Sequence, residues 1–368
     1  MKKIITLILS LSLSLLKADS WTQKADFGGG TRFYNCGFSI GNKGYLGLGS
    51  NSSDDFWEFD PAINIWTQKA DFGGGPRYGA AGFSIGNKGY IGTGNNIDFW
   101  EWDQATNIWT QKANFGGSLV NSAVGFSIGT KGYIGTGYIS GVMSDEFWEW
   151  DQLTNTWSQK ANFAGGARWL AVGFSIGNKG YIGTGADGTS AGSNLFNDLW
   201  EWDQNTNVWI QKASFSVGRV EAMGFSIGSY GFIGIGSVVW GNSDTDDLWE
   251  YNSITDTWIQ VSNFGGGQRE LAQGFSIGCK GYFGTGIIND SNPHSDFWEY
   301  TPNSYVCATA INEMAASGLQ FSLAPNPAIE FIVISYPKTG NEKINLTVTD
   351  SKSKKVFETQ LQPKTSNF

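Results

Sequence analysis

The chain of 368 residues contains 51 glycines, 17 tryptophans, 13 tyrosines and 25 phenylalanines, and its net charge is −9. So many aromatic rings exclude a disordered chain, and the acidic balance argues against nucleic acid or an anionic membrane as a partner. His294 is the only histidine, which excludes copper sites that need two imidazoles.

Residues 1–18 have the pattern of a secretory signal peptide. Lys2 and Lys3 precede an apolar run from Ile4 to Leu16, and a cleavage site is expected before Asp19. No later stretch approaches the ~18 apolar residues that a membrane span requires. We therefore expect an exported, soluble mature protein.

Six copies of one unit occupy residues 19–302. The sequence GFSIG starts at six glycines, and each copy is followed by KGYIGTG or a variant, a variable loop, FWEWD or a variant, and WTQKA or a variant. The six glycines are Gly37, Gly82, Gly125, Gly173, Gly224 and Gly274. Short alternating apolar runs broken by Gly and Asn predict four antiparallel strands per unit, here named a to d. Six such units predict an all-β, six-bladed β-propeller.

These units resemble the kelch repeat family. The resemblance rests on the glycine-rich strand b, the aromatic pair that opens strand c (Phe56 and Trp57 in the first unit), and the tryptophan near the start of strand d. Strand b carries Gly-Thr-Gly or Gly-Leu-Gly where the family has a glycine doublet. The resemblance therefore implies a divergent kelch propeller.

The order of the strands predicts how the ring closes. The first strand d, Trp21 to Ala25, precedes every strand a, whereas no WTQK sequence follows Tyr300. We expect this N-terminal strand to complete the sixth blade beside Phe297–Tyr300, because an open ring would leave two sheet edges exposed.

Residues 303–368 differ in composition and predict a linker followed by a small β-sandwich-like domain. Leu323-Ala324-Pro325-Asn326-Pro327-Ala328 resembles the start of the C-terminal sorting domain used by the type IX secretion system of Bacteroidetes. The resemblance implies contact with that secretion machinery and a secreted or cell-surface location. The last strand and basic terminus of that family are not found before Phe368, so the domain can be truncated.

The three cysteines allow at most one intramolecular bridge. Cys279 is expected in the a–b turn of the sixth blade and Cys307 just beyond its strand c, at the same end of the blade. Cys36 is expected at the other end. We therefore expect a Cys279–Cys307 disulfide.

Five arginines occupy matched positions in the loop between strand d and the next strand a. They are Arg32, Arg77, Arg168, Arg219 and Arg269. They are expected at one mouth of the central channel, where guanidinium groups could bind an anion or a sugar. The alternative is structural, because an acidic residue precedes every strand c at the same end of the blade and could pair with the arginine.

The copies differ most at this mouth, so a specific site is expected there. Beside the arginines lie five unlike residues, namely Tyr34, Tyr78, Trp169, Glu221 and Glu270. The b–c loops also vary, whereas the a–b turns at the opposite end are uniform. Aspartates in Ser243–Asp247 lack the EF-hand spacing, so no metal and no other cofactor is expected.

A second recurrent set is the glutamate of strand c, which occurs in all six copies, and the lysine in five of the strands d. These charges are expected to pair across neighbouring strands. The tryptophans of strands c and d are expected to pack inside and between blades.

Three functions remain open. The first is a non-enzymatic, monomeric binding module for a protein or glycan, supported by the varied mouth and the lack of a complete catalytic set. The second follows from resemblance to six-bladed kelch sialic-acid mutarotases, in which Glu221 or Glu270 beside Arg219 and Arg269 would move a proton. The third is a purely structural repeat protein at the cell surface.

Overall fold

The computed structural model describes residues 6–11, 19–190, 192–240, 243–303, 306, 313–314, 320–324, 333–335, 344–350 and 355–361. The chain divides into two compact units, Asp19–Pro302 and a second unit formed by Met1–Ala18 with Asn303–Phe368. All described elements are strands, so no helix of this part of the chain could cross a membrane.

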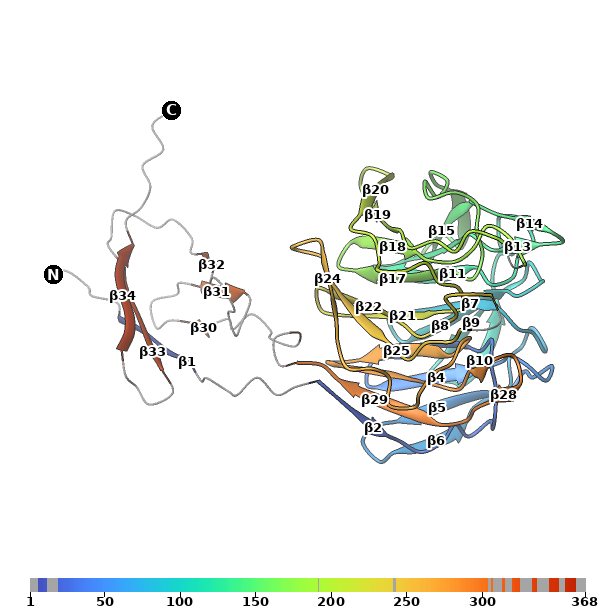
Figure 1. The fold of residues 1–368 in the computed structure, drawn as a ribbon, viewed down its shortest axis with the longest axis horizontal. Helices are drawn as coiled ribbons and strands as arrows, with labels where there is room; N and C mark the ends of the chain where they lie inside the picture. Colours follow the sequence, from blue (N-terminus) through green and yellow to red (C-terminus); the bar gives the residue numbers. More distant parts are fainter. Residues whose placement is uncertain are drawn as a thin grey trace. The chain divides into compact units, whose positions relative to one another are not determined.

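The unit Asp19–Pro302 is a six-bladed β-propeller in which every blade is a four-stranded antiparallel sheet (Figure 1). The innermost strands a are β3 (Cys36–Ile40), β7 (Ala80–Ile85), β11 (Val124–Ile128), β17 (Val172–Ile176), β21 (Met223–Ile227) and β25 (Gln273–Ile277). Each of them contacts the next, and β25 contacts β3, so the ring is closed.

Strands b and c follow within each blade. Strands b are β4 (Lys43–Gly47), β8 (Lys88–Thr93), β12 (Lys131–Gly135), β18 (Lys179–Gly183), β22 (Tyr230–Gly234) and β26 (Lys280–Gly284). Strands c are β5 (Phe56–Asp60), β9 (Phe99–Asp103), β15 (Phe147–Asp151), β19 (Leu199–Asp203), β23 (Leu248–Asn252) and β29 (Phe297–Thr301).

The outermost strands d are β6 (Ile65–Gln68), β10 (Ile108–Gln111), β16 (Thr156–Gln159), β20 (Val208–Lys212), β24 (Thr257–Gln260) and, for the sixth blade, the N-terminal β2 (Ser20–Gln23). β2 pairs antiparallel with β29, and Trp21 lies opposite Tyr300 (Figure 1). The predicted closure by the N-terminal strand is therefore confirmed.

Asp19 strengthens this closure. At five of the six junctions between blades, the backbone N–H of the alanine that follows strand d donates to a side-chain oxygen in the c–d turn of the next blade, as from Ala70 to Asn107 at 3.0 Å. In the sixth blade the Asp19 carboxylate takes that role and accepts from Ser262 N at 2.5 Å. The first residue of the propeller is thus part of its blade-to-blade bonding.

Blades interlock through a phenylalanine and a glycine. Phe83 of β7 lies over Gly132 in strand b of the next blade, where an added Cβ would come within 2.1 Å of the ring. The same contact recurs between all six blades, as with Phe38 and Gly89. A glycine in the middle of strand b therefore lets neighbouring backbones approach closely.

Charge pairs also recur as predicted. Glutamates of strand c and lysines of strand d approach within 4.0 Å in all five blades that carry both, as in Lys69–Glu58 at 3.0 Å and Lys160–Glu149 at 3.1 Å. The strand-c tryptophans Trp102, Trp150 and Trp202 are fully buried. The lysine–glutamate pairs and the buried tryptophans therefore stabilise the blades.

The second unit contains two small sheets among its described residues. One has the order β1 (Thr6–Leu11), β33 (Ile344–Asp350), β34 (Lys355–Leu361), and the other has the order β30 (Glu313–Met314), β31 (Gln320–Ala324), β32 (Val333–Ser335). Pro325 to Ala328, on which part of the resemblance to a sorting domain rests, lie outside the described residues.

Candidate functional site

The five arginines lie inside the blades and do not ring the channel. All five are at most 6 % exposed. Arg168 donates from Nη1 to Asp198 at 2.5 Å and from Nη2 to the same carboxylate at 2.9 Å. Corresponding pairs join Arg32–Asp55, Arg77–Asp98, Arg219–Asp247 and Arg269–Asp296. The predicted ligand site on these arginines is corrected, because a paired and buried guanidinium has no free face for a ligand in the channel.

Each arginine also holds the backbone at the end of strand b. Arg168 Nη1 donates to the carbonyl of Thr184 at 2.9 Å, and Thr184 has a left-handed backbone with φ of 60°. The guanidinium lies 4.8 Å from the centre of the Phe163 ring. The pair with an aspartate, the bond to a carbonyl at the end of strand b and the contact with a phenylalanine ring recur at the other four arginines. These contacts are the ones expected if the arginines have a structural role.

The third blade satisfies its carboxylate without arginine. Val120 takes the arginine position and is buried, while Glu146 accepts hydrogen bonds from Ser118 N and Ser118 Oγ, both at 2.9 Å. This blade therefore replaces a salt bridge by a serine cap. Because it has no arginine here, the third blade offers no positive charge to a ligand at this position.

A ring of backbone hydrogen bonds defines the mouth where the d–a loops meet. Six residues, one from each blade, have left-handed backbones with φ between 51° and 62°, and only one of them is glycine. They are Tyr34, Gly79, Ser122, Leu170, Glu221 and Leu271. Consecutive N–H to O=C bonds of 2.8 to 3.3 Å join them from Leu170 through Ser122, Gly79, Tyr34 and Leu271 to Glu221. We call these six residues the girdle.

Left-handed backbone is costly for residues with a side chain and persists where the surroundings enforce it, often at functional sites. Here the bonds around the girdle enforce it. The backbone direction from which each girdle side chain leaves is consequently fixed. The girdle includes two of the predicted site residues, Tyr34 and Glu221.

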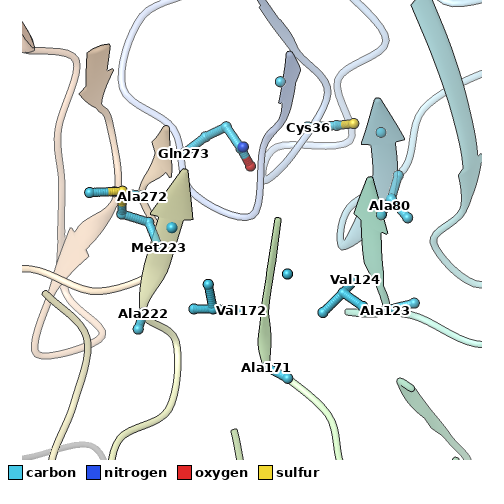
Figure 2. A pocket seen from close by; sticks show the side chains of 16 residues that line it. Cys36, Ala80, Ala123, Val124, Ala171, Val172, Ala222, Met223, Ala272 and Gln273 are labelled. Atoms are coloured by element: carbon cyan, nitrogen blue, oxygen red, sulfur yellow. The ribbon is translucent and has the colours of Figure 1, made fainter. Parts of the chain in front are cut away.

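Beyond the girdle the channel is lined by small apolar residues. Its cavity, open to solvent, has a volume of about 130 Å³ between the first residues of the six strands a. Figure 2 shows alanines and valines around most of the wall, with Cys36, Met223 and Gln273 on one side. No charged side chain lines this cavity, so an anion would gain little by entering it.

Carboxyl groups gather on one side of the mouth. Glu221 is 8 % exposed and Glu270 is fully buried, and Asp244 from the b–c loop of the fifth blade is 5 % exposed. Burial raises the pKa of Glu270, and the neighbouring Glu221 and Asp244 raise it further. Burial likewise raises the pKa of Glu221, although its hydrogen bond with Glu270 opposes that effect. Two neighbouring buried acids do not both ionise readily, so the Glu221–Glu270 pair keeps a shared proton.

The buried carboxyl of Glu270 lacks a donor. Apart from the proton of the Glu221–Glu270 pair, neither oxygen of Glu270 accepts a hydrogen bond from a donor in the described part of the chain, nor does Oδ1 of Asp244. The Glu270 backbone is held by two bonds to Ile287, at 2.9 and 3.0 Å. Asp244 Oδ2 accepts from Asn289 N at 2.8 Å. The cluster is thus rigid and still has unused acceptor oxygens.

Aromatic side chains line the same mouth. Tyr34 and Tyr78 have ring centres 5.8 Å apart, and Tyr78 is 47 % exposed. Trp169 lies 6.1 Å from Trp240, and both pack with Tyr34 against an apolar cluster that includes Val220. Burial raises the pKa of Tyr34, and the nearby Glu221 and Glu270 raise it further. Hence the predicted residues Tyr34, Tyr78, Trp169, Glu221 and Glu270 are all at this mouth.

Sequence reasoning missed Asp244 and Trp240. Both lie in the b–c loop of the fifth blade, where no repeat fixes the alignment. The sequence signal for Asp244 is the acidic run Ser243–Asp247. No group of three or more metal-ligating side chains occurs within the residues that the structure describes.

The predicted disulfide falls partly outside the described residues. Cys279 is exposed and follows the end of β25, but Cys307 lies outside the described residues. Cys36 is buried against the channel, and burial raises the pKa of its thiol to about 12. The Cys36 thiol is therefore unreactive at neutral pH.

Comparison with known proteins defines the class of fold. No family model and no curated protein matches the chain. Solved structures do match, and one of them, titled "Structure of YjhT", has a TM-score of 0.65 at 15 % sequence identity, covering 76 % of this chain and 97 % of that one. At this identity the likeness shows the fold alone. The protein is a six-bladed β-propeller with four-stranded blades.

Proposed function

We propose that this protein is an exported, non-enzymatic glycan-binding module whose site is the girdle mouth. One observation carries the proposal: Tyr34, Tyr78, Trp169 and Trp240 lie at one mouth together with acids whose oxygens are unused. Aromatic faces suit sugar rings because they present apolar area with few rotatable bonds. Unused carboxyl oxygens suit sugar hydroxyls as hydrogen-bond acceptors.

A glycan array tests this proposal with the full mature chain and two variants. Tyr78→Ala removes an exposed ring at the mouth, so it should abolish or weaken array signals while leaving the melting temperature unchanged. Leu153→Ala is the matched control, because Leu153 is 82 % exposed in the c–d turn at the opposite end of its blade. Equal signals from wild type and Tyr78→Ala, or no signal from wild type on a broad array, would contradict the proposal.

Sugar isomerisation is the second candidate, favoured by the proton that Glu221 and Glu270 share. A pair of acids with one proton can both accept and donate a proton at a sugar. The arginines expected to orient an acidic sugar are bound to aspartates, which weakens this candidate. Faster interconversion of sialic acid anomers with wild type than with Glu270→Gln would establish it.

Export is proposed from the sequence features alone. Export by a signal peptide is supported by Lys2 and Lys3 before an apolar run. Use of a type IX sorting domain is supported by the resemblance at Leu323–Ala328. Asp19 is the first residue that the propeller uses in its bonding, so cleavage before Asp19 would leave the ring intact. Mass spectrometry of the exported protein should find Asp19 at the N-terminus, and an intracellular, uncleaved product would contradict export.

A further inference from the structure

We propose that the glycan carries a primary amine, and that its ammonium group binds between Glu221, Glu270 and Asp244. This inference rests on the proposed function and narrows its ligand class to amino sugars.

The unused oxygens call for a donor. Glu270 is fully buried and, apart from the proton it shares with Glu221, neither of its oxygens accepts a hydrogen bond, and Asp244, 5 % exposed, has one unused oxygen. A buried acceptor without a donor is costly. A ligand that brings several N–H donors to this point removes that cost, and an ammonium group brings three.

The charges around the cluster select a cation. The groups that face Glu270 are Glu221 from the fifth d–a loop and Asp244 from the fifth b–c loop, and Asp290 acts on Glu221 from the sixth b–c loop. The nearest cations along the chain, Arg219 and Arg269, are bound to Asp247 and Asp296. A carboxylate ligand would thus meet uncompensated negative charge, whereas an ammonium would neutralise it.

Aromatic rings next to the acids favour an ammonium group as the bound cation. Tyr34 lies close enough for Glu221 and Glu270 to raise its pKa. The centres of the Tyr34 and Tyr78 rings are 5.8 Å apart. Ammonium groups bind well where aromatic faces adjoin carboxylates. Amino sugars combine an ammonium with a ring that can stack, so they use both features.

Isothermal titration of the full mature chain with two matched probes tests the inference. The probes are the β-1,4-linked tetramers of glucosamine and of N-acetylglucosamine, which differ only in the free amine. The glucosamine tetramer should bind at least tenfold more tightly. Binding should also expel the proton shared by Glu221 and Glu270, so heats in phosphate and Tris buffer should differ by the ionisation of roughly one proton.

Two charge-neutral variants separate a binding role from a structural one. Glu270→Gln should weaken binding of the glucosamine tetramer by roughly 10- to 150-fold, as expected for a lost charge-assisted hydrogen bond. Glu149→Gln removes an equal charge from a strand-c ion pair and should bind like wild type. Glu270→Gln should melt no lower than wild type, because it relieves a buried acid.

The outcomes distinguish this inference from the proposed function. Equal binding of both tetramers, unchanged in Glu270→Gln, would overturn the ammonium site and leave the glycan module standing. Binding of neither tetramer while other glycans bind would do the same. Binding of tetralysine but neither tetramer would make the ligand a protein amine and overturn both proposals.

Discussion

Removing Arg168 should destabilise the propeller strongly, because the arginine belongs to the frame of a blade. Its side chain is fully buried, it donates twice to Asp198 and once to the Thr184 carbonyl, and it lies on the Phe163 ring. Truncation to alanine leaves Asp198, 15 % exposed, without its counter-charge. Breaking a buried pair in this way costs about 3–5 kcal/mol.

Urea unfolding followed by tryptophan fluorescence measures this cost, with Lys160→Ala as the control. Lys160 pairs with Glu149 at the surface of a strand, with a side chain 25 % exposed, so its loss should cost at most about 1 kcal/mol. A double variant, Arg168→Ala with Asp198→Ala, should recover part of the loss, because it removes the orphaned charge. An unchanged unfolding midpoint for Arg168→Ala would refute the structural role.

Three further predictions follow from other contacts of the fold. Trp21→Ala should cost about 3–5 kcal/mol in the same unfolding assay, because Trp21 closes the ring against Phe283 at 4.6 Å; a normal midpoint would show that the N-terminal strand is dispensable. Gly132→Ala should lower stability by about 1–3 kcal/mol, since its Cβ would meet Phe83, and a neutral result would contradict the interlock between blades. Burial alone would raise the pKa of Asp247, but Arg219 outweighs it and holds that pKa below the ordinary 3.8, so the contribution of Asp247 to stability should be complete above that value and be lost as the pH drops below it; acid melts in which Asp247→Asn loses as much stability as wild type would disprove the pairing.

The titration of Glu270 has the opposite sign and gives a separate test. Its raised pKa means that the folded protein keeps a proton that the unfolded chain loses above pH 4.5. Stability therefore declines as the pH rises above 4.5 toward the folded pKa. Glu270→Gln should remove this decline and be more stable than wild type at pH 8 in thermal melts. A less stable variant would show that Glu270 supports the fold.

Much of the fold could be predicted because the six repeats report the same strands six times. Trp21 identified the closing strand, since the residue pattern around it matched every other strand d. The recurrence of an acid before each strand c likewise made the structural pairing of Arg168 an available alternative. The repeats do not show which side chains are buried, however. Arginines in glycine-rich loops are usually expected at the surface, so the burial of these five arginines could not be predicted.

The site could be predicted only in part. Tyr34 and Glu221 stood out because they differ between copies at one matched position. Their left-handed backbone arises from hydrogen bonds between blades, which a local sequence pattern does not contain. Asp244 joins Glu270 across two blades from a loop of irregular length, so only the folded chain brings them together.

A crystal structure of the full mature chain with the glucosamine tetramer would test the central claim most directly. The account predicts a sugar ring against Tyr78 or Trp169, with its nitrogen within about 3 Å of a carboxylate oxygen of Glu221, Glu270 or Asp244. A tetramer seated on the uniform a–b turns at the other end of the channel, or held by the outer strands, would contradict it.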